Sequence, residues 1–127
     1  MKNLEIKGEK GIYFVPDVKM NAETGICEIA GESYLEDTVA FYQDIFDWLV
    51  RYIQTEKPIT FNFNLSYFNT NSSRSILSIL KMLKSYEESG GKVQVNWYYQ
   101  DGDVDMLEEV EEYIEDSGMK MSLIACG

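Results

Sequence analysis

The sequence of 127 residues contains no histidine, and it has only two cysteines and two prolines. Histidine is the commonest general acid–base side chain near neutral pH and the commonest metal ligand, so both roles lack their usual residue. An enzyme without histidine would need aspartate or glutamate pairs with shifted pKa values. The acidic residues here instead gather at the expected starts of helices, where water surrounds them. The sequence therefore argues against a catalytic function.

The two cysteines, Cys27 and Cys126, lie far apart and match no metal-binding or redox spacing. We expect both to be reduced thiols in a cytoplasm. The first residues, MKNLEIKGEKG, lack the apolar run of a signal peptide, and no segment approaches the length of a membrane span. These features predict a cytoplasmic protein without a membrane partner.

Positive charge is scarce, because 22 acidic residues stand against 11 basic ones and give a net charge of −11. Nucleic acids and anionic membranes are bound by basic surfaces, so we expect neither as a partner. Only Arg51 and Arg74 offer a guanidinium group to a phosphate. Hydrophobic residues make up 45% of the chain, which excludes disorder and suffices for the core of a single domain, residues 1–127.

The first half of the chain predicts two strands and a helix. The strands are expected over residues 12–18 and 26–31, joined as an antiparallel pair by the turn-like segment NAETG. Ser33 and Glu36 have the spacing of a capping box at the helix start, and the helix ends before Pro58. Its main apolar stripe consists of Tyr42, Ile45, Phe46, Leu49, Val50 and Ile53. A second stripe, better explained by core packing than by an exposed docking patch, consists of Phe41, Trp48 and Tyr52.

The second half predicts alternating strands and helices. Strands are expected over residues 59–68, 93–99 and 119–124, with a helix after the first strand and another over residues 104–116. Gly90-Gly91 is a natural end for the earlier helix. The expected buried positions are Ile76, Ile79, Leu80, Leu83 and Tyr86 in that helix, and Leu107, Val110 and Ile114 in the later one.

These strand–helix–strand units favour right-handed crossovers and parallel neighbouring strands. A parallel sheet covered on both faces would be apolar on both faces. The strands over residues 59–68 and 93–99 instead alternate apolar residues with amides and hydroxyls. We therefore predict an α/β fold of two layers, with a mixed sheet in the order ββαβαβαβ, helices mainly on one face and an amide-rich open face.

A turn rich in hydroxyls and amides, Asn69-Thr70-Asn71-Ser72-Ser73, follows the strand of residues 59–68 and opens a helix. A helix start presents unpaired N–H groups and the positive end of the helix dipole, so it can hold an anion. No base is at hand to activate the hydroxyls, so we interpret the turn as a substrate for phosphorylation. The structural alternative for Thr70 is a role as N-cap or turn residue. Ser72 and Ser73 are secondary acceptor candidates that capping explains better.

Five parts of the chain carry a family resemblance. They are Pro16-Asp17-Val18, Gly31-Glu32-Ser33-Tyr34, Tyr67-Phe68-Asn69-Thr70 with Ser72-Ser73, Gly90-Gly91-Lys92-Val93, and Asn96-Trp97-Tyr98-Tyr99. In this order they resemble the STAS domains of anti-sigma-factor antagonists, and most closely the SiaC-type biofilm-regulation phosphoproteins. Asn71 replaces a usual serine and Arg74 a usual lysine of that pattern. Both changes keep the acceptor, and we expect them to shift kinase preference.

The resemblance implies a STAS-like fold, no cofactor, and a non-enzymatic switch whose phosphorylated residue aligns with Thr70. It implies that a GHKL-type Ser/Thr protein kinase adds the phosphate and that a PP2C-type phosphatase removes it. The unphosphorylated form is expected to bind and activate a diguanylate cyclase in c-di-GMP signalling. The residues expected to contact these partners are Tyr67, Phe68, Asn69, Asn71, Ser72, Ser73 and Arg74.

Two other functions stay open at this point. One is a small-molecule sensor with its ligand near residues 69–73, and the other is an anti-sigma-factor antagonist that acts on a transcription regulator.

The acidic segment 101–112 places Asp101, Asp103, Asp105 and Glu112 at positions 1, 3, 5 and 12 of a calcium loop. Met106 stands where that loop requires glycine, so we expect an acidic helix start and no metal.

Overall fold

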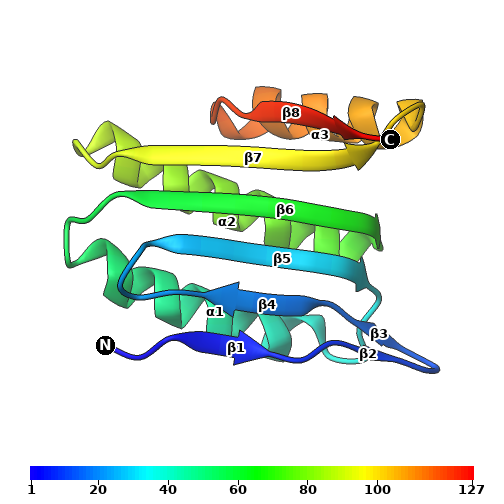
Figure 1. Ribbon diagram of the computed structural model, residues 1–127, viewed down its shortest axis with the longest axis horizontal. Helices are drawn as coiled ribbons and strands as arrows, with labels where there is room; N and C mark the ends of the chain where they lie inside the picture. Colours follow the sequence, from blue (N-terminus) through cyan, green and yellow to red (C-terminus); the bar gives the residue numbers. More distant parts are fainter.

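The computed structural model describes all 127 residues and contains a six-stranded sheet with three helices (Figure 1). The elements in chain order are β1 (Leu4–Ile6), β2 (Glu9–Lys10), β3 (Phe14–Val15), β4 (Asp17–Met20), β5 (Ile26–Ser33), α1 (Thr38–Ile53), β6 (Ile59–Phe68), α2 (Thr70–Glu88), β7 (Val93–Gln100), α3 (Val104–Ser117) and β8 (Ser122–Cys126). The sheet order is β1-β4-β5-β6-β7-β8, while β2 and β3 form a separate ribbon. β1, β4 and β5 are antiparallel neighbours, and β5 to β8 are parallel.

The predicted order ββαβαβαβ is confirmed from β4 to β8, with three short strands in front of it. The strand expected over residues 12–18 is wrong in extent. Phe14–Val15 belongs to the small ribbon, and Asp17–Met20 pairs with β5 across the expected turn. The last strand also lies later than expected, at residues 122–126, because Met119 is buried in the core before the strand begins.

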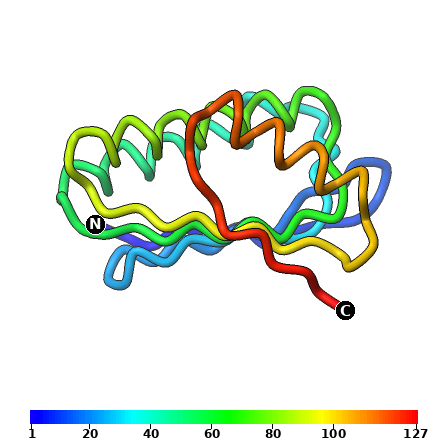
Figure 2. The backbone as a smooth tube through the Cα atoms, turned by 90° about the horizontal axis from the view of Figure 1, so that it is seen from above, coloured from blue at the N-terminus to red at the C-terminus, as the bar shows by residue number.

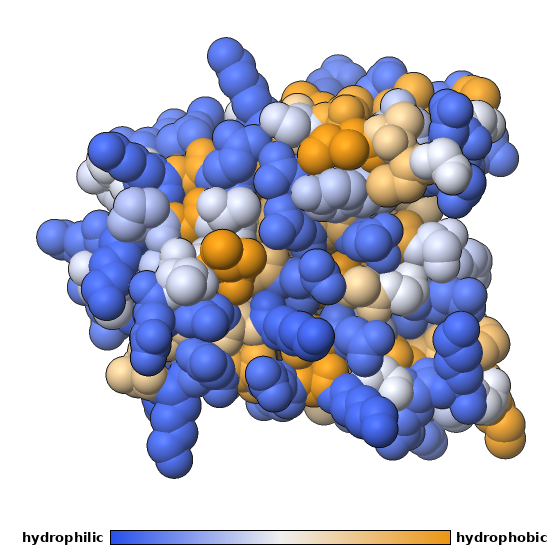
Figure 3. Space-filling view, in the orientation of Figure 1, coloured by the Kyte–Doolittle hydropathy of each residue, from blue (hydrophilic) through white to orange (hydrophobic).

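All three helices lie on one side of the sheet (Figure 2), as the alternation of β6 and β7 predicts. The other face is open and joined by amides: Asn96 Nδ2 donates to Asn62 Oδ1 at 2.8 Å, and Gln94 Nε2 donates to Asn96 Oδ1 at 2.8 Å. Most of the surface seen from the side of Figure 1 is hydrophilic, with hydrophobic residues in separate spots (Figure 3). None of the helices is both long and apolar enough to span a membrane.

The core lies between sheet and helices and contains 26 buried hydrophobic residues. In α1 the expected stripe is partly wrong, because Val50 is 48% exposed whereas Trp48 and Tyr52 are buried and stacked at 5.0 Å. Core packing of the second stripe is therefore confirmed for Trp48 and Tyr52.

The buried face of α3 also differs from the expected one. Met106, Val110 and Tyr113 are buried in this helix, while Leu107 and Ile114 are half-buried. Tyr113 replaces an aliphatic residue in the expected stripe because its ring packs on Phe68 and Trp97 at centroid distances of 5.9 and 5.7 Å. Because Tyr113 faces the core, α3 is turned about its axis relative to the expected orientation. Its residues Glu109 and Glu112 then lie on the side next to the start of α2.

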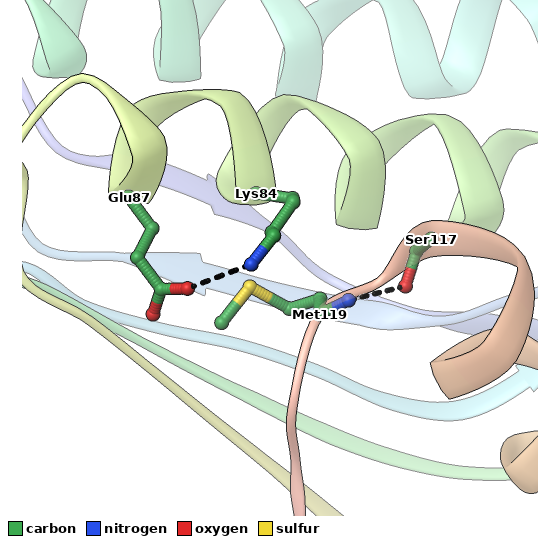
Figure 4. A network of polar contacts seen from close by, with 4 residues as sticks. All are labelled: Lys84, Glu87, Ser117 and Met119. Atoms are coloured by element: carbon green, nitrogen blue, oxygen red, sulfur yellow. Dashed lines mark hydrogen bonds and ion pairs between the residues drawn. The ribbon is translucent and has the colours of Figure 1, made fainter.

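The far end of α3 is tied to the chain that leads into β8. Figure 4 shows the Met119 N–H donating to Ser117 Oγ at 3.0 Å, next to the ion pair of Lys84 and Glu87 on α2 at 3.3 Å. That pair is the single ion pair of the molecule, so packing and hydrogen bonds rather than salt bridges position the elements.

Candidate functional site

The junction of β6 and α2 is built by Asn69. Its Oδ1 accepts a hydrogen bond from the Ser72 N–H at 2.9 Å, and its carbonyl accepts from the Ser73 N–H at 2.8 Å. Asn69 is therefore the N-cap, and Thr70 is the first residue of the helix. The structural alternative of Thr70 as the cap is wrong, because the residue before it supplies the capping group. The expectation that Ser72 and Ser73 act as caps is also wrong, since their hydroxyls bond to Ser33 and Tyr113.

Ser72 is fully buried in a chain of hydroxyl groups below this junction. Ser33 Oγ donates to Ser72 Oγ at 2.8 Å, and Ser72 Oγ donates to the Ser33 carbonyl at 3.1 Å. Ser33 Oγ also lies 2.8 Å from the Tyr42 hydroxyl, which donates because the one proton of Ser33 is used toward Ser72. Burial raises the pKa of Tyr42 to about 12, against the hydrogen bonds of Ser33 and Ser72, which lower it.

The expected capping box of Ser33 and Glu36 is wrong, because the Ser33 hydroxyl is bonded to Ser72 and does not cap α1. Ser33 is the last residue of β5, and its hydroxyl points into the core toward Ser72. Asp37 is the N-cap of α1, and its Oδ1 accepts from the Ala40 N–H at 3.1 Å. Ser33 thus fastens the first turn of α2 to β5 instead of starting α1.

Ser73 ties α2 to α3. Its Oγ lies 2.6 Å from the hydroxyl of Tyr113, in a half-buried position. Burial raises the pKa of Tyr113, the hydrogen bond to Ser73 lowers it, and the charge of Glu109 adds to the rise. The phenol therefore keeps its proton near neutral pH, and the contact persists as a neutral hydrogen bond.

Thr70 differs from both serines, because its side chain is exposed and makes no hydrogen bond within the chain. It lines an open pocket of about 350 Å³ between the start of α2 and one side of α3. The other lining residues are Phe68, Ser73, Glu109, Glu112 and Tyr113. Burial raises the pKa of Glu109, and the neighbouring carboxylates of Glu112, Asp105 and Asp103 raise it further.

The remaining residues expected at the partner-binding loop are not equally accessible. Tyr67, Asn71 and Arg74 are exposed, and Asn69 and Ser73 are half-buried. Phe68 and Ser72 are buried, so they support the loop from below instead of facing a partner. Asn71 and Arg74 line a second hollow, of about 380 Å³, together with residues 36–39 at the start of α1 and Ser75.

The acidic segment 101–112 forms the start of α3. Asp103 is the N-cap, and its Oδ1 accepts from the Met106 N–H at 3.0 Å. No group of three or more cysteine, aspartate or glutamate side chains is placed to hold a metal ion. The negative charge of Asp105 in the first turn interacts favourably with the positive end of the helix dipole. The acidic helix start expected from the sequence is confirmed.

Sequence reasoning missed Ser33, Tyr42, Glu109 and Glu112 as parts of this site. Ser33 lies in β5 and Tyr42 in α1, both before the strand that leads to Thr70. The two glutamates lie in α3, after the next strand. Glu109 and Glu112 read as ordinary solvated residues of an acidic helix, and only the packing of α3 on α2 places them beside Thr70.

The fold and this junction define a two-layer α/β domain that presents an exposed hydroxyl at the start of a helix. The sequence profile described as "SiaC family regulatory phosphoprotein" matches residues 6–126. The chain belongs to this family, whose members are regulatory phosphoproteins and not enzymes.

Solved structures from Pseudomonas aeruginosa agree with this assignment. A chain in the crystal structure of the diguanylate cyclase SiaD in complex with its activator SiaC superposes with a TM-score of 0.90 at 25% identity, covering 97% of this chain and 99% of that one. Apo-SiaC superposes with a TM-score of 0.88 at 25% identity, covering 98% and 100%. An uncharacterised protein of P. aeruginosa strain UCBPP-PA14 is 25% identical over 98% of both chains. The expected fold class is thus confirmed.

Proposed function

We propose that this protein is a phosphorylation-controlled binding switch and that Thr70 is its phosphoacceptor. The observation that carries the proposal is the difference among three neighbouring hydroxyls in a member of a phosphoprotein family. Thr70 is exposed and free of hydrogen bonds, whereas Ser72 is buried and Ser73 is bonded to Tyr113. A kinase can reach Thr70 without unfolding the first turn of α2.

The proposed modifying enzymes are a GHKL-type Ser/Thr protein kinase and a PP2C-type phosphatase, both acting in the cytoplasm. In the transfer, Thr70 Oγ1 forms a bond to the γ-phosphorus of ATP while the bond to the ADP oxygen breaks. The hydroxyl proton passes to a base of the kinase. Hydrolysis by the phosphatase returns the hydroxyl and releases inorganic phosphate.

The proposed effector of the unphosphorylated form is a diguanylate cyclase, which it binds and activates in c-di-GMP signalling. The relative SiaC is the activator of such a cyclase, SiaD, and this supports the proposal. The surface offered to the effector is the exposed part of the loop, Tyr67, Thr70, Asn71 and Arg74, with Asn69 and Ser73 between them.

Phosphorylation is proposed to act by local blocking and not by refolding. A phosphate adds about −1.5 to −2 charge units at an exposed position. A partner pressed against the loop would then bury an unpaired charge, which is costly. Kinase, phosphatase and effector need the same surface, so we expect them to compete for it.

The acceptor is tested in protein isolated from its own host by mass-spectrometric mapping of phosphopeptides. We expect phosphate on Thr70 and none in Thr70→Ala. Abundant phosphate elsewhere, with Thr70→Ala still fully labelled, would overturn the assignment.

Blocking is tested by comparing melting temperature and cyclase affinity for the unmodified and phosphorylated forms. Similar melting with a large loss of affinity supports it. Thr70→Ala should keep binding and Thr70→Glu should weaken it. The charge control is Ser85→Glu, at an exposed position near the other end of α2, and it should leave binding unchanged. A drop of many degrees on phosphorylation, or unchanged affinity, would contradict blocking.

A further inference from the structure

The pocket that contains Thr70 carries negative charge and no positive charge. Its two charged residues are Glu109 and Glu112 of α3, and its remaining residues are neutral. Arg74 lies one helical turn after Thr70 on α2, at the i+4 spacing of neighbouring side chains, and it lines the other hollow with Glu36 and Asp37. A phosphate on Thr70 therefore meets two carboxylates on the side of α3.

Two opposing fields would act on this phosphate. The first turn of α2 presents free N–H groups and the positive end of its dipole, which favour an anion at the first helical position. The carboxylates of α3 oppose the same anion by like-charge repulsion. Building on the proposed phosphorylation of Thr70, we infer that Glu109 and Glu112 repel the Thr70 phosphate and cancel the stabilisation that the start of α2 offers.

The position of α3 makes this repulsion a fixed property of the fold. Tyr113, one residue after Glu112, is bonded to Ser73 at 2.6 Å and packs against Phe68 and Trp97. The backbone that carries the two glutamates is thus held beside the start of α2. The raised pKa of Glu109, caused first by burial and then by neighbouring carboxylates, accords with a pocket already unfavourable to negative charge.

The functional consequence concerns where the phosphate points. Repulsion from α3 turns it out of the pocket, so it stays on the exposed surface where a partner meets it. A phosphate drawn into the pocket by a basic residue would be neutralised and partly hidden. The acidic pocket therefore keeps the phosphate exposed, so that partners can contact it and a phosphatase can remove it.

The test uses full-length protein with phosphothreonine installed at position 70 during synthesis, so that it does not depend on any kinase. The second pKa of the phosphate, ordinarily about 6, is measured by phosphorus NMR titration. We expect Glu109→Gln with Glu112→Gln to lower it by roughly 0.5 to 1 unit, because two nearby like charges are removed. The matched control is Glu108→Gln with Glu111→Gln, which removes the same charge from exposed α3 positions outside the pocket.

A second measurement needs no phosphate. The change in melting temperature caused by Thr70→Glu is measured in two backgrounds, the native one and the one with both pocket substitutions. We expect this change to be more favourable in the second background, by roughly 2–4 °C. Equal pKa values in pocket and control variants, together with equal melting shifts, would overturn the inference. A failure of the kinase to modify Thr70 would overturn the proposed function but leave both measurements valid.

Discussion

The buried hydroxyl chain of Tyr42, Ser33 and Ser72 leads to a prediction about non-additive stability. The three side chains come from α1, β5 and α2, and all are buried. Ser33 Oγ stands in the middle, 2.8 Å from each of the other two hydroxyls. Either outer partner alone can satisfy it, because its single proton can turn toward the remaining oxygen.

The magnitudes follow from which groups lose all their partners. Tyr42→Phe alone should cost about 1 kcal/mol of unfolding free energy, the net worth of one hydrogen bond. Ser72→Ala alone should cost about 2 kcal/mol, because its hydroxyl makes two hydrogen bonds, one accepted from Ser33 Oγ and one donated to the Ser33 carbonyl. Together they leave Ser33 Oγ buried without a side-chain partner, which adds roughly 1–3 kcal/mol beyond the sum. Adding Ser33→Ala removes the orphaned hydroxyl and should recover most of that excess.

The assay is urea denaturation followed by far-UV circular dichroism, with the free energy of unfolding compared across the single, double and triple variants. Tyr98→Phe serves as control, since this half-buried tyrosine makes no hydrogen bond within the chain, and should change stability by less than about 0.5 kcal/mol. Strict additivity of the two single changes, or a triple variant less stable than the double, would refute the reasoning.

Three further predictions concern other parts of the fold. Gly25→Ala should cost about 2–4 kcal/mol in the same assay, because φ is +73° and the new Cβ would collide with the Tyr52 hydroxyl and the Pro58 carbonyl, whereas Gly11→Ala should be neutral. Burial raises the pKa of Cys27 to about 12 from 9.0, so the thiol of the unfolded chain ionises first and the free energy of unfolding falls as pH rises from 9 to 12. Between pH 7 and about pH 10.5, the free energy of unfolding of Cys27→Ala should therefore fall by about 2 kcal/mol less than that of the native protein. An equal fall in the two proteins would contradict this prediction. Millimolar calcium should leave the melting temperature unchanged because Asp103 is occupied as the N-cap of α3, and a rise that disappears in Asp103→Ala would prove this wrong.

The sheet and helix order could be predicted because its main elements are long and periodic. β6 alternates along its whole first half, and all five expected core positions of α2 are buried. The short strands β1, β2 and β3 have two or three residues each, too few for a period to show. They are fixed instead by pairing with partners that the local sequence does not reveal.

The faces of α1 were harder to predict because amphipathic aromatic residues have polar ends. Trp48 Nε1 donates to the Lys2 carbonyl at 2.9 Å, and the Tyr52 hydroxyl donates to the Pro58 carbonyl at 2.7 Å. Once these groups have partners, both rings can be buried. Neither partner is visible from the periodicity of the helix.

One part of the candidate site could be predicted from the sequence and another part could not. The cap, the exposed threonine and the following serines are neighbours in sequence, so the turn of residues 69–73 could be found from residue types alone. Glu109 and Glu112 line the same pocket as Thr70 because the packing of Tyr113 on Phe68 and Trp97 sets which face of α3 lies toward α2. That orientation depends on side-chain packing across three elements, and no local pattern encodes it.

The contacts around the start of α2 bear on which kind of switch the loop can be. Asn69 caps the helix, Ser72 is held by Ser33 of β5, and Ser73 is held by Tyr113 of α3. A phosphate on either serine would have to break the contact that positions the first turn, so a switch there would act by refolding. Thr70 alone among the three is free of such a contact, and a phosphate on it changes the surface while the supports beneath stay intact. The proposed blocking mechanism thus depends on the two serines being occupied as much as on the threonine being exposed.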